Sequence, residues 1–98
     1  MDKKELEAIP VWERQPTHSG EILREILEDE NLTQTKLAEE IGVSFRAVNE
    51  LINGKRRITP EMALKLSKRF KTTPLFWLNL QADYDLWKAA RRMERVGA

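Results

Sequence analysis

The feature that most constrains this fold is the segment 32–60, which carries the pattern of two short helices joined by a tight turn. Thr33 can cap the first helix, because its hydroxyl accepts a hydrogen bond from an unpaired N–H of the first turn. Apolar residues then recur at helical spacing on one face. Gly42 ends this helix, since glycine adopts the left-handed conformation without a Cβ clash. The segment therefore predicts a helix that stops abruptly and turns.

A second helix follows at once, with Ser44 as its cap, an apolar inner face, and Asn53 and Gly54 at its end. The small side chain of Ala38 allows the two helices to cross closely. Two helices at a steep angle, joined by about three or four residues, make a helix-turn-helix. The second helix of this motif can lie in the major groove of DNA with its first residues at base edges. The alternative is a helical hairpin that binds nothing, but the glycine, the small crossing residue and a basic run downstream favour DNA binding.

The rest of the chain is also helical in pattern, with no strand pattern anywhere. One helix is expected from His18 and Ser19 to about Glu30. Two more begin at Thr-Pro pairs, where a hydroxyl cap precedes a proline in the first helical position. With the two central helices, these predict an all-α, compact five-helix domain with a long C-terminal helix. We expect an N-terminal extension at 1–17 and a helix-turn-helix domain with a C-terminal dimerisation helix at 18–98.

Composition excludes several classes of function. There is no cysteine and one histidine, so neither a disulfide nor a metal site rich in thiolate or imidazole is expected. No apolar run approaches the length of a membrane span, and residues 1–5 show no signal-peptide pattern. No paired carboxylates, nucleophile–base set or phosphate-binding glycine loop is present, so we expect no enzyme and no cofactor. A soluble cytoplasmic protein is the expectation.

The charges are unevenly distributed although the net charge is only +1. Residues 1–30 hold nine acidic and four basic residues, whereas residues 61–98 hold four acidic and eight basic residues. This asymmetry indicates an anionic partner for the basic part and a cationic one for the acidic part. An ordinary surface with clustered charges is the alternative.

Basic residues also follow the second motif helix directly. Lys55, Arg56 and Arg57 come immediately after its end, where side chains of a DNA-bound protein face the phosphates beside the groove. A solvated loop is the alternative, and the DNA-reading helix just upstream favours phosphate contact.

The last predicted helix has more large apolar surface than one small domain needs. A self-complementary face on this helix would make a two-fold homodimer. In the alternative, its later part folds back on the first helix. The expected interface residues are Trp77, Leu80, Tyr84 and Trp87. We expect them to be divided between the core and the dimer seam, with Tyr84 and Trp87 toward the seam.

Three apolar residues, Ile9, Val11 and Trp12, stand in the otherwise polar N-terminal segment. They predict either a docking segment for a partner, since aromatic anchors often carry interface energy, or a tail that packs back on the domain.

The residues also resemble a known family. PTHSGEILREIL, NGKRRITPEMALKL and FWLNLQADYDLW, together with the motif LTQTKLAEEIGVS, are similar to the HigA-type antitoxins of the lambda-repressor-like (XRE-type) helix-turn-helix group. The resemblance covers about residues 16–87. It implies a small all-helical dimer that binds its own operator, represses a toxin–antitoxin gene pair, and holds a small basic RNA-cleaving toxin of the HigB type inactive.

Carried over by position, the resemblance implies that both motif helices carry DNA-facing residues. The expected residues are Gln34 at the start of the first helix, with its cap Thr33 beside it, and Ser44, Phe45, Arg46, Asn49 and Asn53 on the second. The sequence departs from the family at Phe45, where relatives usually have a polar residue, and at Glu50, which puts an acid near the groove.

Two classes of function remain. The first is a sequence-specific DNA-binding repressor, as an antitoxin or as a stand-alone regulator without a toxin. The second is a protein-interaction module that has lost DNA binding. The opposed charges of Arg46 and Glu50 leave this second class open.

Overall fold

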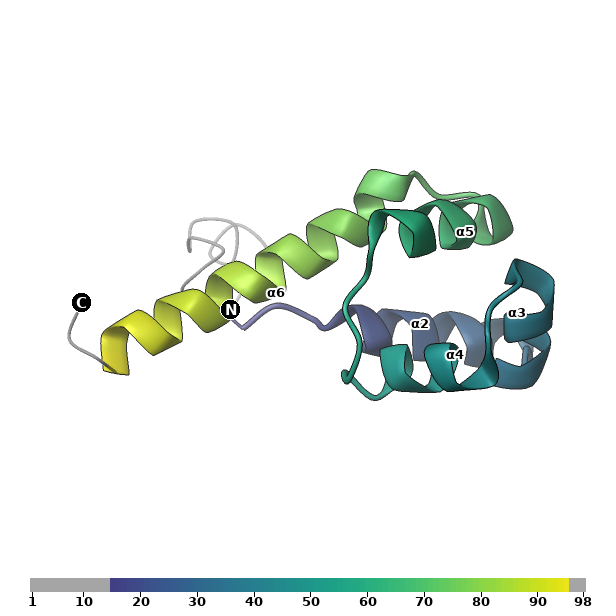
Figure 1. The fold of residues 1–98 in the computed structure, drawn as a ribbon, viewed down its shortest axis with the longest axis horizontal. Helices are drawn as coiled ribbons and strands as arrows, with labels where there is room; N and C mark the ends of the chain where they lie inside the picture. The colour runs from purple at the N-terminus through teal and green to yellow at the C-terminus, as the bar shows by residue number, and fades with distance from the viewer. Residues whose placement is uncertain (1–14, 96–98) are drawn as a thin grey trace.

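The structure, a computed structural model, describes residues 15–95. Five helices and no strand are found in this range. They are α2 (Ser19–Glu30), α3 (Gln34–Ile41), α4 (Phe45–Ile52), α5 (Pro60–Phe70) and α6 (Pro74–Arg95) (Figure 1). The predicted all-α fold with five helices and a long C-terminal helix is confirmed.

The helix starts follow the expected local chemistry. Nδ1 of His18 accepts a hydrogen bond from the backbone N–H of Gly20 at 2.9 Å, so this imidazole caps α2. Threonine and serine hydroxyls cap α3, α4 and α5 in the same manner. Gly42 ends α3 with a φ of 72°, a left-handed conformation that glycine adopts without strain. Local sequence therefore determines where these helices begin and where α3 ends.

The helices surround one apolar core. Figure 1 shows α2 and α4 side by side, with α3 across one end and α5 on the opposite side of the molecule. Ala38 of α3 is buried in this core, and α3 packs against both α4 and α5. Trp77 is fully buried, and its indole N–H donates to the Thr72 hydroxyl at 2.8 Å. Its bulk joins the first turns of α6 to the core, whose buried apolar members are Leu23, Leu27, Leu37, Ala38, Ile41, Ala47, Val48, Leu51, Ile52, Ile58, Met62, Ala63, Leu66 and Trp77.

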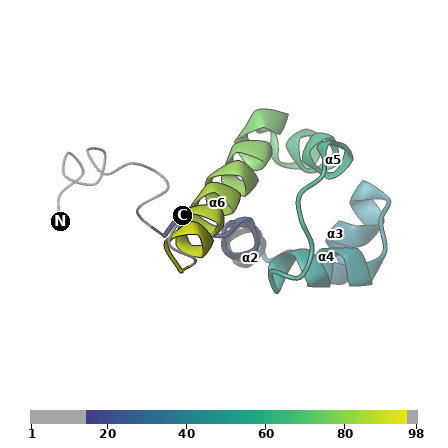
Figure 2. The same ribbon diagram turned by 60° about the vertical axis from the view of Figure 1, so that its left-hand side comes forward.

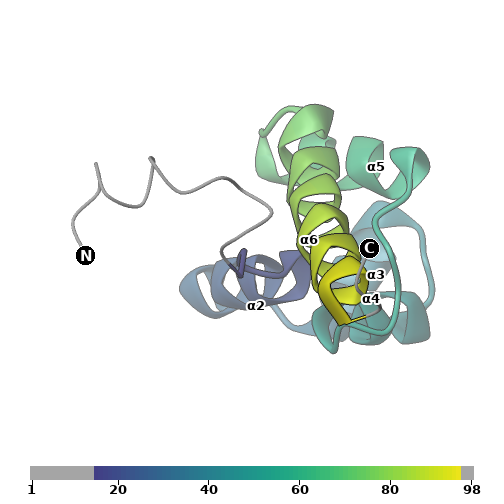
Figure 3. The ribbon, with the colours of Figure 1, turned by 90° about the vertical axis from the view of Figure 1, so that its left-hand side faces the viewer.

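The long helix α6 contacts both α5 and α2, as Figures 2 and 3 show from two sides. Its C-terminal half then extends beyond the other helices along the longest dimension of the molecule (Figure 1). None of the helices in residues 15–95 is both long enough and apolar enough to cross a membrane.

Candidate nucleic-acid interface

The start of α4 lies on the surface, and its cap fixes its geometry. The Ser44 hydroxyl accepts a hydrogen bond from the backbone N–H of Ala47 at 3.0 Å, and the Thr33 hydroxyl does the same for Lys36 at 3.1 Å at the start of α3. Both expected DNA-facing hydroxyls thus already act as caps. Phe45, the first residue of α4, is 52% exposed, so an apolar ring stands at the tip of this helix.

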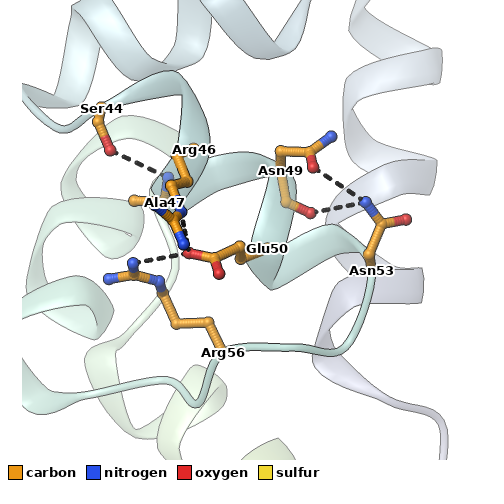
Figure 4. A network of polar contacts seen from close by, with 7 residues as sticks. All are labelled: Ser44, Arg46, Ala47, Asn49, Glu50, Asn53 and Arg56. Atoms are coloured by element: carbon orange, nitrogen blue, oxygen red, sulfur yellow. Dashed lines mark hydrogen bonds and ion pairs between the residues drawn. The ribbon is translucent and has the colours of Figure 1, made fainter.

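Side-chain amides connect the two motif helices. The Asn49 amide N–H donates to the Gln34 carbonyl at 3.1 Å, which joins the middle of α4 to the first residue of α3. Nδ2 of Asn53 lies 3.0 Å from the backbone carbonyl of Asn49 and 3.2 Å from its side-chain oxygen (Figure 4). The structure therefore brings three of the expected DNA-facing side chains together, with the donors and acceptors that read base edges.

Sequence reasoning missed a member of this network on α2. Nη2 of Arg24 lies 3.5 Å from the side-chain oxygen of Asn53, at the C-terminus of α4. Arg24 is exposed and adds a cation beside the amides. No motif could have assigned it, because 29 positions separate the two residues and only the packing of α2 beside α4 brings them together.

Glu50 lies between two of the expected DNA-binding cations. One carboxylate oxygen is 2.8 Å from Nη2 of Arg56, in the loop after α4, and 3.5 Å from Nε of Arg46, one turn earlier (Figure 4). The hydrogen bond from Arg56, together with the positive charge of Arg46, holds the pKa of Glu50 below its ordinary value. The acid is therefore ionised at neutral pH.

The three loop cations have different surroundings. Arg57 turns toward α6, where its two terminal nitrogens lie 2.9 and 2.8 Å from the two carboxylate oxygens of Asp85. Burial raises the pKa of Asp85, but the hydrogen bonds from Arg57 and Gln81 outweigh this and hold it below its ordinary value. Arg56 is paired with Glu50. Within residues 15–95, Lys55 forms no ion pair, so it is the loop cation most available to a phosphate.

The loop itself is fixed from α6. The side-chain oxygen of Gln81, a buried residue, accepts a hydrogen bond from the backbone N–H of Ile58 at 2.9 Å, and its amide donates to Asp85 at 3.1 Å. Ile58 is buried directly after the three cations. Sequence reasoning did not identify Gln81, Ile58 or Asp85 as supports of this loop, since their pairing depends on tertiary structure.

The expected dimer residues occupy different environments. Trp77 is fully buried in the core of a single copy, so it has no surface that a partner could contact. Of the four expected interface residues, it therefore belongs to the core and not to the seam. Leu80 is partly buried against that core. The Tyr84 ring stands edge-on to the His18 ring, with centroids 4.7 Å apart. This contact with the start of the first helix corresponds to the alternative to a dimer seam, in which the later part of α6 folds back on that helix. Trp87 is half-buried. Ile9, Val11 and Trp12 lie outside the described residues.

Within residues 15–95, no group of three or more histidine, cysteine, aspartate or glutamate side chains could hold a metal ion. What the arrangement offers is a surface of amides, exposed cations and one aromatic ring around the start of α4. Such groups bind base edges and phosphates.

Comparison with known proteins identifies helix-turn-helix proteins as relatives of this chain. A family model described as helix-turn-helix (HTH_3) matches residues 23–78, more than half of the chain. The "Uncharacterized HTH-type transcriptional regulator YbaQ" of Escherichia coli K12 is 48% identical over 81 residues, which cover 82% of this chain and 72% of the relative. The "Antitoxin HigA-1" of Vibrio cholerae is 42% identical over 82 residues, which cover 83% of this chain and 77% of the relative.

A solved structure is similar in fold as well as in sequence. The Pseudomonas aeruginosa antitoxin HigA, determined with the higBA promoter, superposes with a TM-score of 0.78 at 36% identity. The alignment covers 83% of this chain and 89% of the other.

Proposed function

Because the chain belongs to the helix-turn-helix family that includes the HigA-type antitoxins, we propose that it is a sequence-specific DNA-binding antitoxin that represses its own operon. In this role it binds an operator in double-stranded DNA as a homodimer. It also neutralises a HigB-type RNA-cleaving toxin by forming a complex with it. It performs no catalysis of its own.

The observation that carries DNA binding is the exposed polar face at the start of α4. The Arg46 side chain is 83% exposed, and Asn49 is held beside it by the hydrogen bond to Gln34. An arginine fork can bridge O6 and N7 of guanine, and an asparagine or glutamine amide can do the same for adenine. This face therefore carries the side-chain types that distinguish bases in the major groove.

The Pseudomonas antitoxin HigA supports this proposal, because it was determined with promoter DNA and shares the fold over most of this chain. In the proposed complex α4 enters the major groove, Thr33 and Ser44 lie at the two helix starts, and Lys55 contacts a flanking phosphate. Arg56 and Arg57 would reach phosphates only after leaving their carboxylate partners.

Toxin neutralisation is supported by the HigA relatives and by the excess of acidic residues in 1–30. A negative segment attracts a cationic RNA-cleaving protein and speeds the encounter. Ile9, Val11 and Trp12 are proposed as the apolar anchor of this contact. The mechanism is occlusion, in which the antitoxin covers toxin surface or keeps the toxin from its RNA.

One observation favours a second candidate. The Escherichia coli relative is described as a transcriptional regulator, and its identity of 48% exceeds the 42% of the HigA-1 antitoxin. A stand-alone DNA-binding regulator without a toxin partner uses the same α4 surface and lacks only the N-terminal contact.

Two experiments test the proposal. Footprinting on the DNA upstream of the gene should show a protected site at the promoter, and its absence would contradict operon repression. Co-expression with the product of the neighbouring gene should yield a stable complex that relieves growth arrest, and Trp12→Ala in the full chain should weaken this complex while leaving the footprint intact. A footprint without any toxin complex would favour the stand-alone regulator.

A further inference from the structure

The acid on the proposed DNA-reading helix needs an explanation, because a carboxylate in the groove repels phosphates. Glu50 lies on α4 four residues after Arg46 and six before Arg56. Its side chain is 24% exposed, less than the 46% of Arg56 and the 83% of Arg46. The carboxylate is thus partly covered by the two arginines that it binds (Figure 4).

The two contacts differ in strength. The Arg56 contact is a charged hydrogen bond of 2.8 Å, whereas the Arg46 contact is a looser pair at 3.5 Å across one helical turn. Hydrogen bonds between charged groups are stronger than neutral ones. In the free protein, therefore, both arginines have an internal partner, and Arg46 is the more easily released.

We propose that Glu50 is a specificity-determining residue, which holds Arg46 and Arg56 away from DNA until the operator supplies a better partner. This inference rests on the DNA binding proposed above. It assigns to Glu50 a positioning role, since it acts through the arginines and not by reading a base itself.

Glu50 would affect the preference for the operator because phosphate contacts form with any DNA sequence, whereas base contacts form only with some sequences. Every duplex offers phosphates, so two unpaired arginines near the groove would strengthen binding to all DNA. A guanine at the position where the Arg46 fork can bridge its O6 and N7 is present only in some sequences. With Glu50 in place, a duplex without that guanine gains little from Arg46, whereas the operator gains a bidentate contact. Glu50 therefore lowers binding to random DNA more than binding to the operator.

The test compares Glu50→Gln with Glu94→Gln. Both changes remove one negative charge, keep the size of the side chain, and break a contact with an arginine on the same helix. Glu94 lies near the end of α6, which projects away from α4 (Figure 1). Circular dichroism verifies that both variants fold. Dissociation constants are measured by fluorescence anisotropy for the footprinted operator fragment and for a scrambled duplex of equal length, over a series of salt concentrations.

For Glu50→Gln we expect binding to scrambled DNA to tighten by about threefold or more, with a salt slope steeper by about one unit for each arginine released. Binding to the operator should change less, so the ratio of the two constants falls. Glu94→Gln should behave as the wild type does on both duplexes. In a background of Arg46→Gln and Arg56→Gln, Glu50→Gln should have no effect on the ratio, because the groups through which it acts are gone.

Three results would overturn the inference: an equal change on both duplexes, the same change in Glu94→Gln, or an effect that persists without the two arginines. The last result would mean that Glu50 repels DNA directly. A wild-type protein that does not prefer the footprinted fragment at all would overturn sequence-specific binding itself, and this inference with it. Failure of the inference alone would instead appear as any of these three results in a protein whose wild type still prefers the footprinted fragment.

Discussion

At the scale of single residues, the proposed DNA surface consists mostly of side chains that already have partners within the protein. Ser44 caps a helix, and Asn49 and Asn53 are joined to each other and, through Asn49, to Gln34. Groups held in this way lose less conformational freedom when a ligand binds, because their ordering has already occurred on folding. Arg46 differs, since its side chain is 83% exposed and its pairing is loose. It is therefore the residue with the most freedom to reach a base.

We predict that Arg46→Ala weakens operator binding by about 1–3 kcal/mol and binding to scrambled DNA far less. The reason is the loss of a bidentate contact that only certain bases provide. Anisotropy titrations on both duplexes provide the measurement, and Arg92→Ala, an exposed arginine near the end of α6, is the control. Equal weakening on the two duplexes would make Arg46 a phosphate contact and refute its base-reading role.

At the scale of helices and loops, two contacts fix the proposed DNA surface to the rest of the fold. The first is the approach of α2 to α4 at Gly20, where an added Cβ would lie 2.3 Å from the backbone oxygen of Leu51. The second is the support of the loop after α4 by Gln81 and Asp85 of α6. The first contact orients α4, and the second orients the cations that follow it.

Gly20→Ala should destabilise the protein by about 1–3 kcal/mol, because backbone atoms of α4 occupy the place of the new methyl group and the helices must move apart. Urea denaturation measures this directly. Asn79→Ala, at an exposed position of α6, should leave the free energy of unfolding within about 0.5 kcal/mol of the wild type. A Gly20→Ala variant as stable as wild type would mean that α2 and α4 are not in such close contact.

Asp85→Asn should lower the melting temperature at pH 7, and the difference from wild type should disappear at low pH. The pKa of Asp85 is depressed in the folded protein, so its ionised form stabilises the fold above the unfolded-state value of about 3.9. This stabilisation is lost as the pH falls through the lower folded-state pKa. Thermal scans in steps from pH 7 down to about pH 1–2 provide the test, with Asp83→Asn on the same helix as the control. A difference that does not shrink as the pH falls would exclude the ion pair with Arg57 as its cause.

The sequence was sufficient to predict these elements but not the contacts between them. Caps such as Ser44 and the stop at Gly42 act within one turn of chain, so spacing alone locates the helix ends. The bridge from Glu50 to Arg56 and the pair of Arg57 with Asp85 depend on how the loop passes over α4 and α6. For this reason three adjacent loop cations, identical in the sequence pattern, have three different environments in the structure.

At the scale of the whole molecule, α6 leaves apolar surface exposed from its first turn to its C-terminal end. Leu75, Leu86 and Met93 are 63%, 50% and 53% exposed. Their spacings of 11 and 7 residues place them on one side of an α-helix. The helical period of 3.6 residues places this stripe on nearly the opposite side of α6 from Tyr84, so it offers a dimer surface separate from the one predicted for Tyr84 and Trp87. None of these three residues is among the interface residues expected from the sequence.

Leu86→Glu should convert the proposed homodimer to a monomer that remains helical, because a charge in an apolar seam is not compensated. Light scattering after gel filtration gives the mass, and weak operator binding should accompany the smaller species. Leu64→Glu is a matched control, since Leu64 is 51% exposed but lies on α5. A dimer unaffected by Leu86→Glu, or disrupted equally by Leu64→Glu, would place the interface elsewhere.

The most direct test of sequence-specific DNA recognition through α4 is an anisotropy titration on the fragment upstream of the gene, with scrambled DNA of equal length and base composition as competitor. We predict a preference of about 10³-fold or more for the natural fragment, which falls markedly in Arg46→Ala. The affinity for both duplexes should decrease steeply with salt. Equal affinity for the natural and scrambled fragments would contradict sequence-specific recognition through α4.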